Sequence, residues 1–338
     1  EFNSRPVLDS SGNIYIGRAD GLAKYSSAGN LIWLFSPSAD VIEKAVYTPP
    51  LITSNGTIYF RGALGLYAVN QDGQLRWRYA LSGTSGNYAA LAILSDGTII
   101  TQLAEKITAI NQDATLKWIF DPGRAMNSSN SIGAFVVDSS DNIFVTIDNY
   151  IYKISAAGSL IWEKNLGSEY SSLALGPDNT LYVSSASWVP VMGFQGGFYA
   201  LDVNDGSTKW SDVGSFNNHA ELAPVVDSSN KVYVIMSYGG AWVSSTKLQS
   251  YNAANATSTP GWTSANLGPY LAAPILTSDG KIYVTDQKTL KTFSASDGAL
   301  LGSFNAEDNG DLYTYFGAVG RNGTIYTANA YILYAIDD

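Results

Sequence analysis

The sequence contains no cysteine and a single histidine among its 338 residues. The lack of cysteine excludes disulfides, thiol nucleophiles and thiolate metal sites. Any Ser-His-Asp triad would have to use His219, and no G-x-S-x-G motif accompanies it. We therefore expect His219 to be a loop residue without a catalytic role.

Positive charge is also scarce, with 19 Lys and Arg residues against 29 Asp and Glu and a formal net charge of −10. The chain has no basic cluster to neutralise phosphates, which argues against nucleic acid and anionic membranes as partners. No apolar run approaches the roughly 18 residues that a membrane-spanning helix needs. A surface of Ser, Thr, Asn and Gly with few lysines fits secreted, periplasmic or cell-surface proteins, so we expect an extracytoplasmic location. The first residues, EFNS, suit a mature or excised chain.

One sequence motif recurs eight times along the chain. It consists of apolar residues, a polar turn with Gly or Asn, and a β-branched residue that is usually followed by Tyr, as in PVLDSSGNIYI from Pro6 and PILTSDGKIYV from Pro274. The turn positions recur roughly every 40 to 50 residues, the period of a propeller blade. These positions are Gly12, Gly56, Gly97, Asp141, Asn179, Asn230, Gly280 and Gly323.

A second apolar run follows each motif, such as LYAVN from Leu66 and LYAIDD from Leu333. A turn and a strand that contains Trp come next. Repeat seven has Gly302 where Trp is expected, and repeat eight stops before this strand. Each unit therefore predicts four short strands with period-two alternation and no helical period. The repeated Trp residues are Trp33, Trp77, Trp118, Trp162, Trp210 and Trp262.

The eight repeats predict an all-β fold, an eight-bladed β-propeller of four-stranded antiparallel blades, over residues 1–338 as a single domain. The eighth blade either has three strands or is completed by a missing upstream segment. In the turns, we expect Asp9, Asp138 and Asp227 to accept hydrogen bonds from backbone amides.

The combined pattern, P-x5-G-x-I-Y-V followed by L-Y-A-L-(N/D)-x3-G-x3-W, resembles the PQQ-like repeat. That repeat builds the blades of eight-bladed quinoprotein dehydrogenases and of the non-enzymatic scaffold lipoprotein in the bacterial outer-membrane β-barrel assembly machinery. The resemblance covers essentially the whole chain and implies that the Trp residues pack between neighbouring blades. The dehydrogenases' disulfide of adjacent cysteines and calcium-ligand insertion have no counterpart here, and the lipid-bearing cysteine is absent. We therefore expect no PQQ and no other cofactor.

Calcium is the one metal for which the sequence offers a candidate site. The richest acidic stretch, Glu307-Asp308-Asn309-Gly310-Asp311, precedes the first strand of the eighth repeat. A calcium site needs six to eight oxygen ligands. We expect a solvated loop there, with calcium as the alternative.

Departures from the repeat indicate a binding surface. Five Tyr residues precede first strands and would line the mouth of the central channel, where they could stack sugars, line a partner interface or simply pack. The segments SSASWVPVMGFQGG in blade five and IMSYGGAWVSSTK in blade six replace loops of about five residues and are aromatic, so they either form a patch or pack on each other. The predicted ligand-binding residues are Tyr47, Tyr88, Tyr170, Trp188, Met192, Phe194, His219, Glu221, Tyr238, Trp242, Tyr270 and Tyr313.

These features favour a non-catalytic, extracytoplasmic binding or scaffold module that presents one propeller face to a protein or glycan. The module would be a monomer or part of a larger multidomain protein. The alternative is a polysaccharide lyase or hydrolase on the same face, because acid–base residues are available there. A PQQ-dependent dehydrogenase is the third reading. The candidate residues for the polysaccharide enzyme are Lys44, Arg124, Tyr170, His219 and Glu221.

Overall fold

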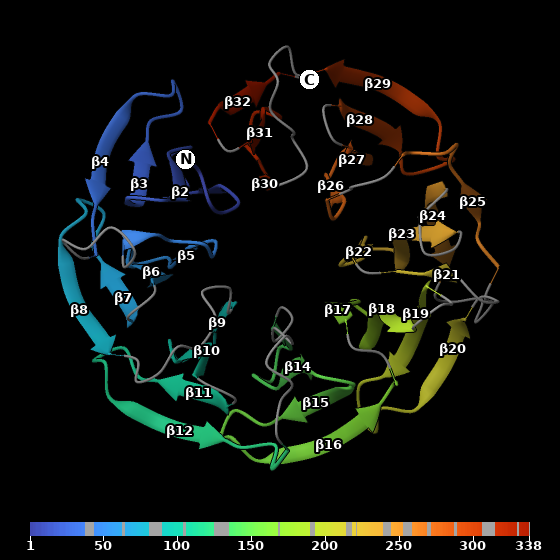
Figure 1. The fold of residues 1–338 in the computed structure, drawn as a ribbon, viewed down its shortest axis with the longest axis horizontal. Helices are drawn as coiled ribbons and strands as arrows, with labels where there is room; N and C mark the ends of the chain where they lie inside the picture. Colours follow the sequence, from blue (N-terminus) through green and yellow to red (C-terminus); the bar gives the residue numbers. More distant parts are fainter. Residues whose placement is uncertain are drawn as a thin grey trace. The chain divides into compact units, whose positions relative to one another are not determined.

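In the computed structural model, the strands group into two compact units of the chain, Glu1–Ala125 with Asp308–Asp338, and Met126–Glu307. The described strands form eight sheets, four in each unit (Figure 1). The structure describes residues 1–37, 44–62, 65–80, 90–103, 106–124, 135–167, 170–189, 193–213, 218–220, 222–238, 245–252, 259–268, 272–286, 289–305, 315–329 and 331–337.

The first unit contains blades one, two, three and eight, and each is an antiparallel sheet whose strands follow chain order from one edge to the other. The strands of blades one and two are β1 (Val7–Leu8), β2 (Ile14–Arg18), β3 (Gly21–Tyr25), β4 (Leu31–Phe35), β5 (Leu51–Ile52), β6 (Ile58–Gly62), β7 (Gly65–Val69) and β8 (Leu75–Ala80). Those of blades three and eight are β9 (Leu91–Ile93), β10 (Ile99–Leu103), β11 (Lys106–Ile110), β12 (Leu116–Phe120), β30 (Tyr315–Val319), β31 (Ile325–Ala328) and β32 (Leu333–Ile336).

The second unit contains blades four to seven, again as antiparallel sheets. Blades four and five consist of β13 (Val136–Val137), β14 (Ile143–Ile147), β15 (Tyr150–Ile154), β16 (Leu160–Asn165), β17 (Tyr170–Leu175), β18 (Thr180–Val189), β19 (Gly193–Asp202) and β20 (Thr208–Asp212). Blades six and seven consist of β21 (Asn218–His219), β22 (Val225–Val226), β23 (Lys231–Tyr238), β24 (Ser245–Asn252), β25 (Trp262–Thr263), β26 (Ile275–Leu276), β27 (Lys281–Asp286), β28 (Thr289–Ser294) and β29 (Leu300–Asn305).

The fold is the predicted all-β, eight-bladed propeller. Blade eight has three strands in the described residues, which both alternatives left open by the sequence require of this chain. Blade six departs from the expected four strands, because β21 and β22 both pair with β23. The prediction of a single domain stays a prediction.

The turns between first and second strands form as the sequence predicts. Asp9 Oδ1 accepts hydrogen bonds from the backbone amides of Ser11 and Asn13, both at 2.9 Å. The carboxylates of Asp138 and Asp227 accept equivalent pairs of amide hydrogen bonds. Gly12 has a φ of 79°, in the left-handed region that favours glycine. The predicted Asx hydrogen bonds are therefore confirmed for all three aspartates.

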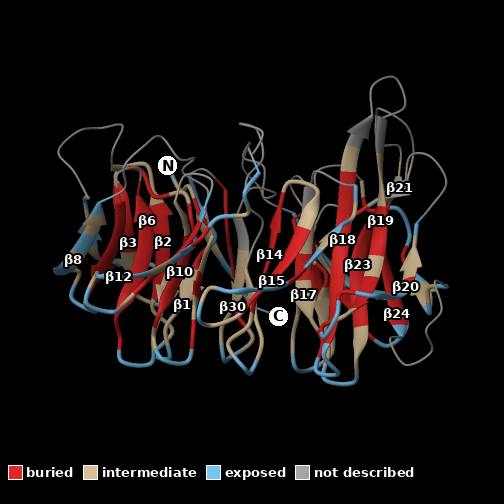
Figure 2. Ribbon diagram, turned by 90° about the horizontal axis from the view of Figure 1, so that it is seen from below, coloured by how far each residue is buried: buried red, intermediate tan, exposed pale blue. Residues whose placement is uncertain are grey.

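The second and third strands of the blades carry the core, and the fourth strands form the outer edges. Tyr15, Tyr59 and Tyr233, which follow the β-branched residue of the repeat, are at most 2% exposed. Figure 2 shows β3, β6 and β23 largely buried, whereas the outer strand β8 is exposed or half-buried. Burial of these apolar side chains between sheets is the main stabilising contribution.

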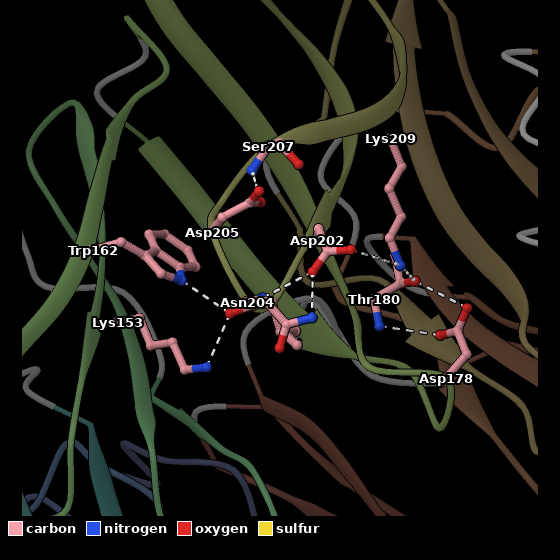
Figure 3. A network of polar contacts seen from close by, with 10 residues as sticks. Lys153, Trp162, Asp178, Thr180, Asp202, Asn204, Asp205, Ser207 and Lys209 are labelled. Carbon is pink, nitrogen blue, oxygen red and sulfur yellow. Dashed lines mark hydrogen bonds and ion pairs between the residues drawn. The ribbon is translucent and has the colours of Figure 1, made fainter.

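In four blades, the Trp of the outer strand donates a hydrogen bond to the following blade. Trp162 Nε1 donates to the Val203 carbonyl at 2.9 Å, and Lys153 Nζ donates to the same oxygen at 2.9 Å (Figure 3). Corresponding indole bonds run from Trp33 to Gln71 O (2.8 Å), from Trp77 to Gln112 O (2.7 Å) and from Trp262 to Ala295 O (3.2 Å).

The burial of these indoles varies among the blades. Trp162 and Trp210 are buried, and the other four repeated Trp residues are half-buried. The expected packing between neighbouring blades is confirmed for the four Trp residues that donate to the following blade, Trp33, Trp77, Trp162 and Trp262.

Candidate binding surface on blades five and six

The hairpin of blade five is twice as long as its counterparts in blades one, two and four. Strands β18 and β19 have ten residues each, whereas β14 and β15 have five. Their register runs from Thr180↔Asp202 to Trp188↔Phe194 and Val189↔Gly193. The segment predicted as a long loop is therefore mostly a continuation of the two strands, and the loop prediction was wrong there.

Small residues explain why the strands continue. Ser184, Ser185 and Ala186 on β18 are fully buried. An added Cβ at Gly196 would lie 2.0 Å from Ser185 O, and one at Gly197 would lie 2.7 Å from Asp212 O. Backbones can approach this closely only where a side chain is missing. The ladder then satisfies backbone groups that a loop would have to expose to water.

The extension of β18 also recruits the residues before it in the chain. Tyr170 is the first residue of β17 and pairs with Ala186, although the sequence suggested that it precedes the strand. The cause is again the length of β18, because a longer second strand offers partners to three more residues of the first. The side chain of Tyr170 lies outside the described residues.

Blade six also has a long hairpin, and it is connected to that of blade five. Strands β23 and β24 have eight residues each, and β21 pairs with the end of β23 through His219↔Ser237. The Ala220 amide donates to Ser185 O at 3.2 Å, which ties β21 to the hairpin of blade five. We call β17, the β18–β19 hairpin, β21 and the β23–β24 hairpin the blade-five/six platform.

Tyr238 is the one predicted ligand-binding side chain that is described on this platform. It is half-buried and packs against a cluster that contains Trp210 and Tyr251. The Lys247 ammonium lies 5.8 Å from the centre of its ring. Burial raises the pKa of the Tyr238 hydroxyl, and the nearby Asp212 carboxylate raises it further. Tyr238 therefore supports the core at least in part.

Sequence reasoning missed a polar contact beneath this surface. The Tyr251 hydroxyl lies 2.6 Å from Asp212 Oδ2 and 2.8 Å from Gln249 Oε1. Burial and the hydrogen bond to Asp212 both raise the pKa of Tyr251. The signal for the platform itself was the Gly196-Gly197 pair in the middle of a strand, opposite a run of small residues.

The remaining predicted residues are placed only in part. The backbones of Trp188, Phe194 and His219 belong to the platform, but their side chains lie outside the described residues. Tyr47 is half-buried in the first unit. Outside the described residues lie Tyr88, Met192, Glu221, Trp242, Tyr270, Tyr313 and the acidic stretch from Glu307 to Asp311.

The alternative enzymatic set is divided between the two units. Lys44 is half-buried and Arg124 is exposed in the first unit, whereas Tyr170 and His219 belong to the second. Within the described ranges, no three His, Cys, Asp or Glu residues group together as a metal site. Among the same residues, no helix is long and apolar enough to cross a membrane.

Comparison with known proteins identifies relatives of the repeat. The family model described as outer membrane protein assembly factor BamB matches residues 1–212 and 105–247. The crystal structure of BamB from Moraxella catarrhalis is similar with a TM-score of 0.73 and 16% identity, over 99% of this chain and 94% of that one.

Two further structures share the fold. The computationally designed Ika8 protein has a TM-score of 0.73 and 13% identity, over 99% of this chain and 95% of that one. Quinohemoprotein alcohol dehydrogenase from Comamonas testosteroni has a TM-score of 0.69 and 12% identity, over 97% of this chain and 70% of that one. No curated protein sequence matches the chain. At these identities the structural similarities establish the fold alone.

Proposed function

The chain belongs to the family of outer membrane protein assembly factor BamB, and on that premise we propose that it is a non-catalytic scaffold that binds a protein partner outside the cytoplasm during assembly of outer membrane proteins. The family name supports both the process and the location. The observation that carries the binding role is the blade-five/six platform, the part of the second unit that exceeds the repeat.

The platform suits a protein partner because its hairpin is already formed and its strands end in backbone groups that another strand could pair with. Within the described strands, β18 has no pairing with β17 beyond Ala186, and β19 pairs with β20 only from Phe198 onward. The end of the hairpin is thus held mainly by its own ladder. Exposed strand ends recognise extended segments of other proteins by backbone hydrogen bonding. A preformed hairpin loses little conformational entropy on binding.

The end of the hairpin also carries the aromatic residues that a protein interface favours. Trp188 and Phe194 occupy directly opposite positions in the β18–β19 register. Aromatic residues are enriched among those that dominate binding energy at protein interfaces. We therefore assign the partner-binding role to this pair together with the neighbouring strand β21.

The proposal is tested in cells of the source organism by deleting the gene and measuring folded outer membrane β-barrel proteins by their heat-dependent gel mobility. We expect the folded fraction to fall and to be restored by the wild-type gene. A double variant, Trp188→Ser with Phe194→Ser, should restore it poorly although the protein accumulates normally. Unchanged folded fractions after deletion would refute the role in assembly.

The matched control removes an apolar side chain from the same unit but away from the platform. Leu160 on β16 is 47% exposed, so Leu160→Ser should fold and should complement the deletion fully. If the Trp188/Phe194 variant complements as well as the Leu160→Ser variant, the platform is not the binding surface and the assignment fails.

A further inference from the structure

The repeated tyrosine of the second strand has an internal hydrogen-bond acceptor in blades one and six. The Tyr15 hydroxyl lies 3.1 Å from Asp9 Oδ2 of the preceding turn. The Tyr233 hydroxyl lies 3.1 Å from Asp227 Oδ2 in the equivalent turn of blade six. In blade two, Thr53 stands where blade one has Asp9. The turn of blade two therefore lacks the carboxylate that accepts this hydrogen bond in the other two blades.

Tyr59 is the tyrosine of blade two, and it is almost completely buried. It is 2% exposed, and among the described residues its hydroxyl has no hydrogen-bond partner. Burial raises the pKa of this hydroxyl, so it stays protonated at neutral pH and can both donate and accept. Buried polar groups in folded proteins nearly always have a partner. The Tyr59 hydroxyl is therefore available to a bound molecule.

A cavity of about 370 Å³ lies beside Tyr59, between blades two and three of the first unit (Figure 1). Its lining includes Tyr59 and residues 53–55 of the preceding turn. Tyr59 pairs with Leu51 as Tyr15 pairs with Val7, so the hydroxyl of Tyr59 is directed at this turn. The volume falls within the range of roughly 300 to 1,000 Å³ that is usual for small-molecule sites.

The polar side chains of the lining offer hydrogen-bond donors and acceptors together. Asn55 Oδ1 accepts from the Thr57 amide at 3.0 Å and from the Thr53 hydroxyl at 2.6 Å, which leaves the side-chain nitrogen of Asn55 as a donor. Gln112 Nε2 donates to the Asp96 carbonyl at 3.0 Å, which leaves Gln112 Oε1 as an acceptor. Because a hydroxyl group both donates and accepts, a ligand with several hydroxyls matches this lining.

The charges at the cavity favour a neutral ligand. Asp96 belongs to the lining, and the hydrogen bond from Lys117 lowers its pKa to about 2, so its carboxylate is ionised at neutral pH and repels anions. The Lys117 ammonium lies 2.6 Å from Asp96 Oδ2 and balances this charge, so a cation gains little. Ile52 and Ile93 are half-buried and give the lining an apolar part. A pyranose ring has a matching apolar C–H face and a rim of neutral hydroxyls.

We propose that the cavity between blades two and three binds a single neutral pyranose unit, with the Tyr59 hydroxyl donating to one of its oxygens. Asn55 and Gln112 would bind further hydroxyls, and Ile52 and Ile93 would contact the C–H face. A ligand of this size with few polar contacts should bind with a dissociation constant in the roughly millimolar range. The site belongs to the first unit and the blade-five/six platform to the second, so the two proposals stand or fall separately.

The direct test is saturation-transfer difference NMR on the full-length protein. The probes are methyl β-D-glucopyranoside, methyl β-D-galactopyranoside and glycerol. At least one glycoside should give a signal that saturates with a roughly millimolar dissociation constant. Glycerol has hydroxyls but no ring face, and it should bind at least tenfold more weakly. The absence of saturable binding by both glycosides would overturn the proposal, as would glycerol binding of equal strength.

Variants of the protein locate the site. Tyr59→Phe removes only the hydroxyl and should weaken glycoside binding at least fivefold. Thr53→Asp introduces the acceptor that blade one has, so it should engage the Tyr59 hydroxyl internally and weaken binding to a similar extent. Tyr15→Phe is the matched control at the same repeat position, and because the Tyr15 hydroxyl bonds to Asp9 the change should leave binding unchanged. Wild-type affinity in either site variant, or loss of binding in the control, would contradict the assignment.

Discussion

At the scale of single residues, the indole contacts between blades make the clearest prediction. Trp162 is 9% exposed, packs against Phe144 and donates to Val203 O. Trp162→Ala should lower the free energy of unfolding by about 3 to 5 kcal/mol, because it removes a buried aromatic ring and leaves a cavity. Trp162→Phe keeps most of the packing and should cost less. Denaturant unfolding measures both values, and equal stability of Trp162→Ala and wild type would contradict the docking role.

Asp96 gives a prediction for pH. A hydrogen bond from the Lys117 ammonium at 2.6 Å, with further bonds from Thr98, lowers the pKa of Asp96 to about 2. A lowered carboxylate pKa stabilises the folded state above the unfolded value of about 3.8, and this stabilisation is lost as pH falls through about 2. Because the side chain is 53% exposed, Asp96→Asn should cost less than about 1 kcal/mol at neutral pH and almost nothing near pH 2. Unfolding at the two pH values measures this, and an NMR titration midpoint of Asp96 near 3.8 would contradict it.

At the scale of elements, the periodic strands could be predicted and the platform only in part. The repeated β-branched residues, turn glycines and Trp positions fix strand type and order, because each performs the same packing role in every blade. Blade five breaks this relation. Trp188 and Phe194 suggested an aromatic loop, whereas the backbone forms a ladder whose pairing depends on close approach at Gly196. That approach involves residues on two strands, so local sequence patterns do not reveal it.

The hairpin extension can be tested through this glycine. Gly196→Val would force a side chain against Ser185 O, so we expect the ladder from Ser185 to Val189 to open while the rest of blade five remains folded. Amide hydrogen exchange should accelerate at these residues and stay slow in β14. Gly302→Val is the control, because an added Cβ at Gly302 meets nothing within 4 Å. Unchanged exchange in the Gly196→Val variant would show that the close approach is unnecessary.

At the scale of the whole molecule, composition and fold are linked. The low charge and abundant Gly, Tyr and Trp follow from eight copies of one blade, and the repeat therefore predicts the architecture over the full chain. The binding role proposed above rests on an exception to the repeat. The blade-five insertion was visible in the sequence, whereas the exposure of Ala335 in Leu333-Tyr334-Ala335-Ile336 emerged only from comparison with the buried Leu66-Tyr67-Ala68-Val69 of β7. Similar repeat sequences conceal such a difference in burial, because burial depends on the neighbouring strand and not on the strand's own residues.

Completion of blade eight should stabilise the molecule as well as occupy its open edge. In blade two, five residues separate the end of β7 at Val69 from the start of β8 at Leu75. Fusing Gly-Gln-Leu-Arg-Trp-Arg-Tyr-Ala after Asp338 through a turn of similar length would supply the strand at high effective concentration. We expect the melting temperature to rise by roughly 2 °C or more. The same fusion with Ser in place of Trp should give a smaller gain, because the strand would pair with β32 without burying an indole. Equal melting temperatures for the two fusions would mean that the indole contributes nothing there.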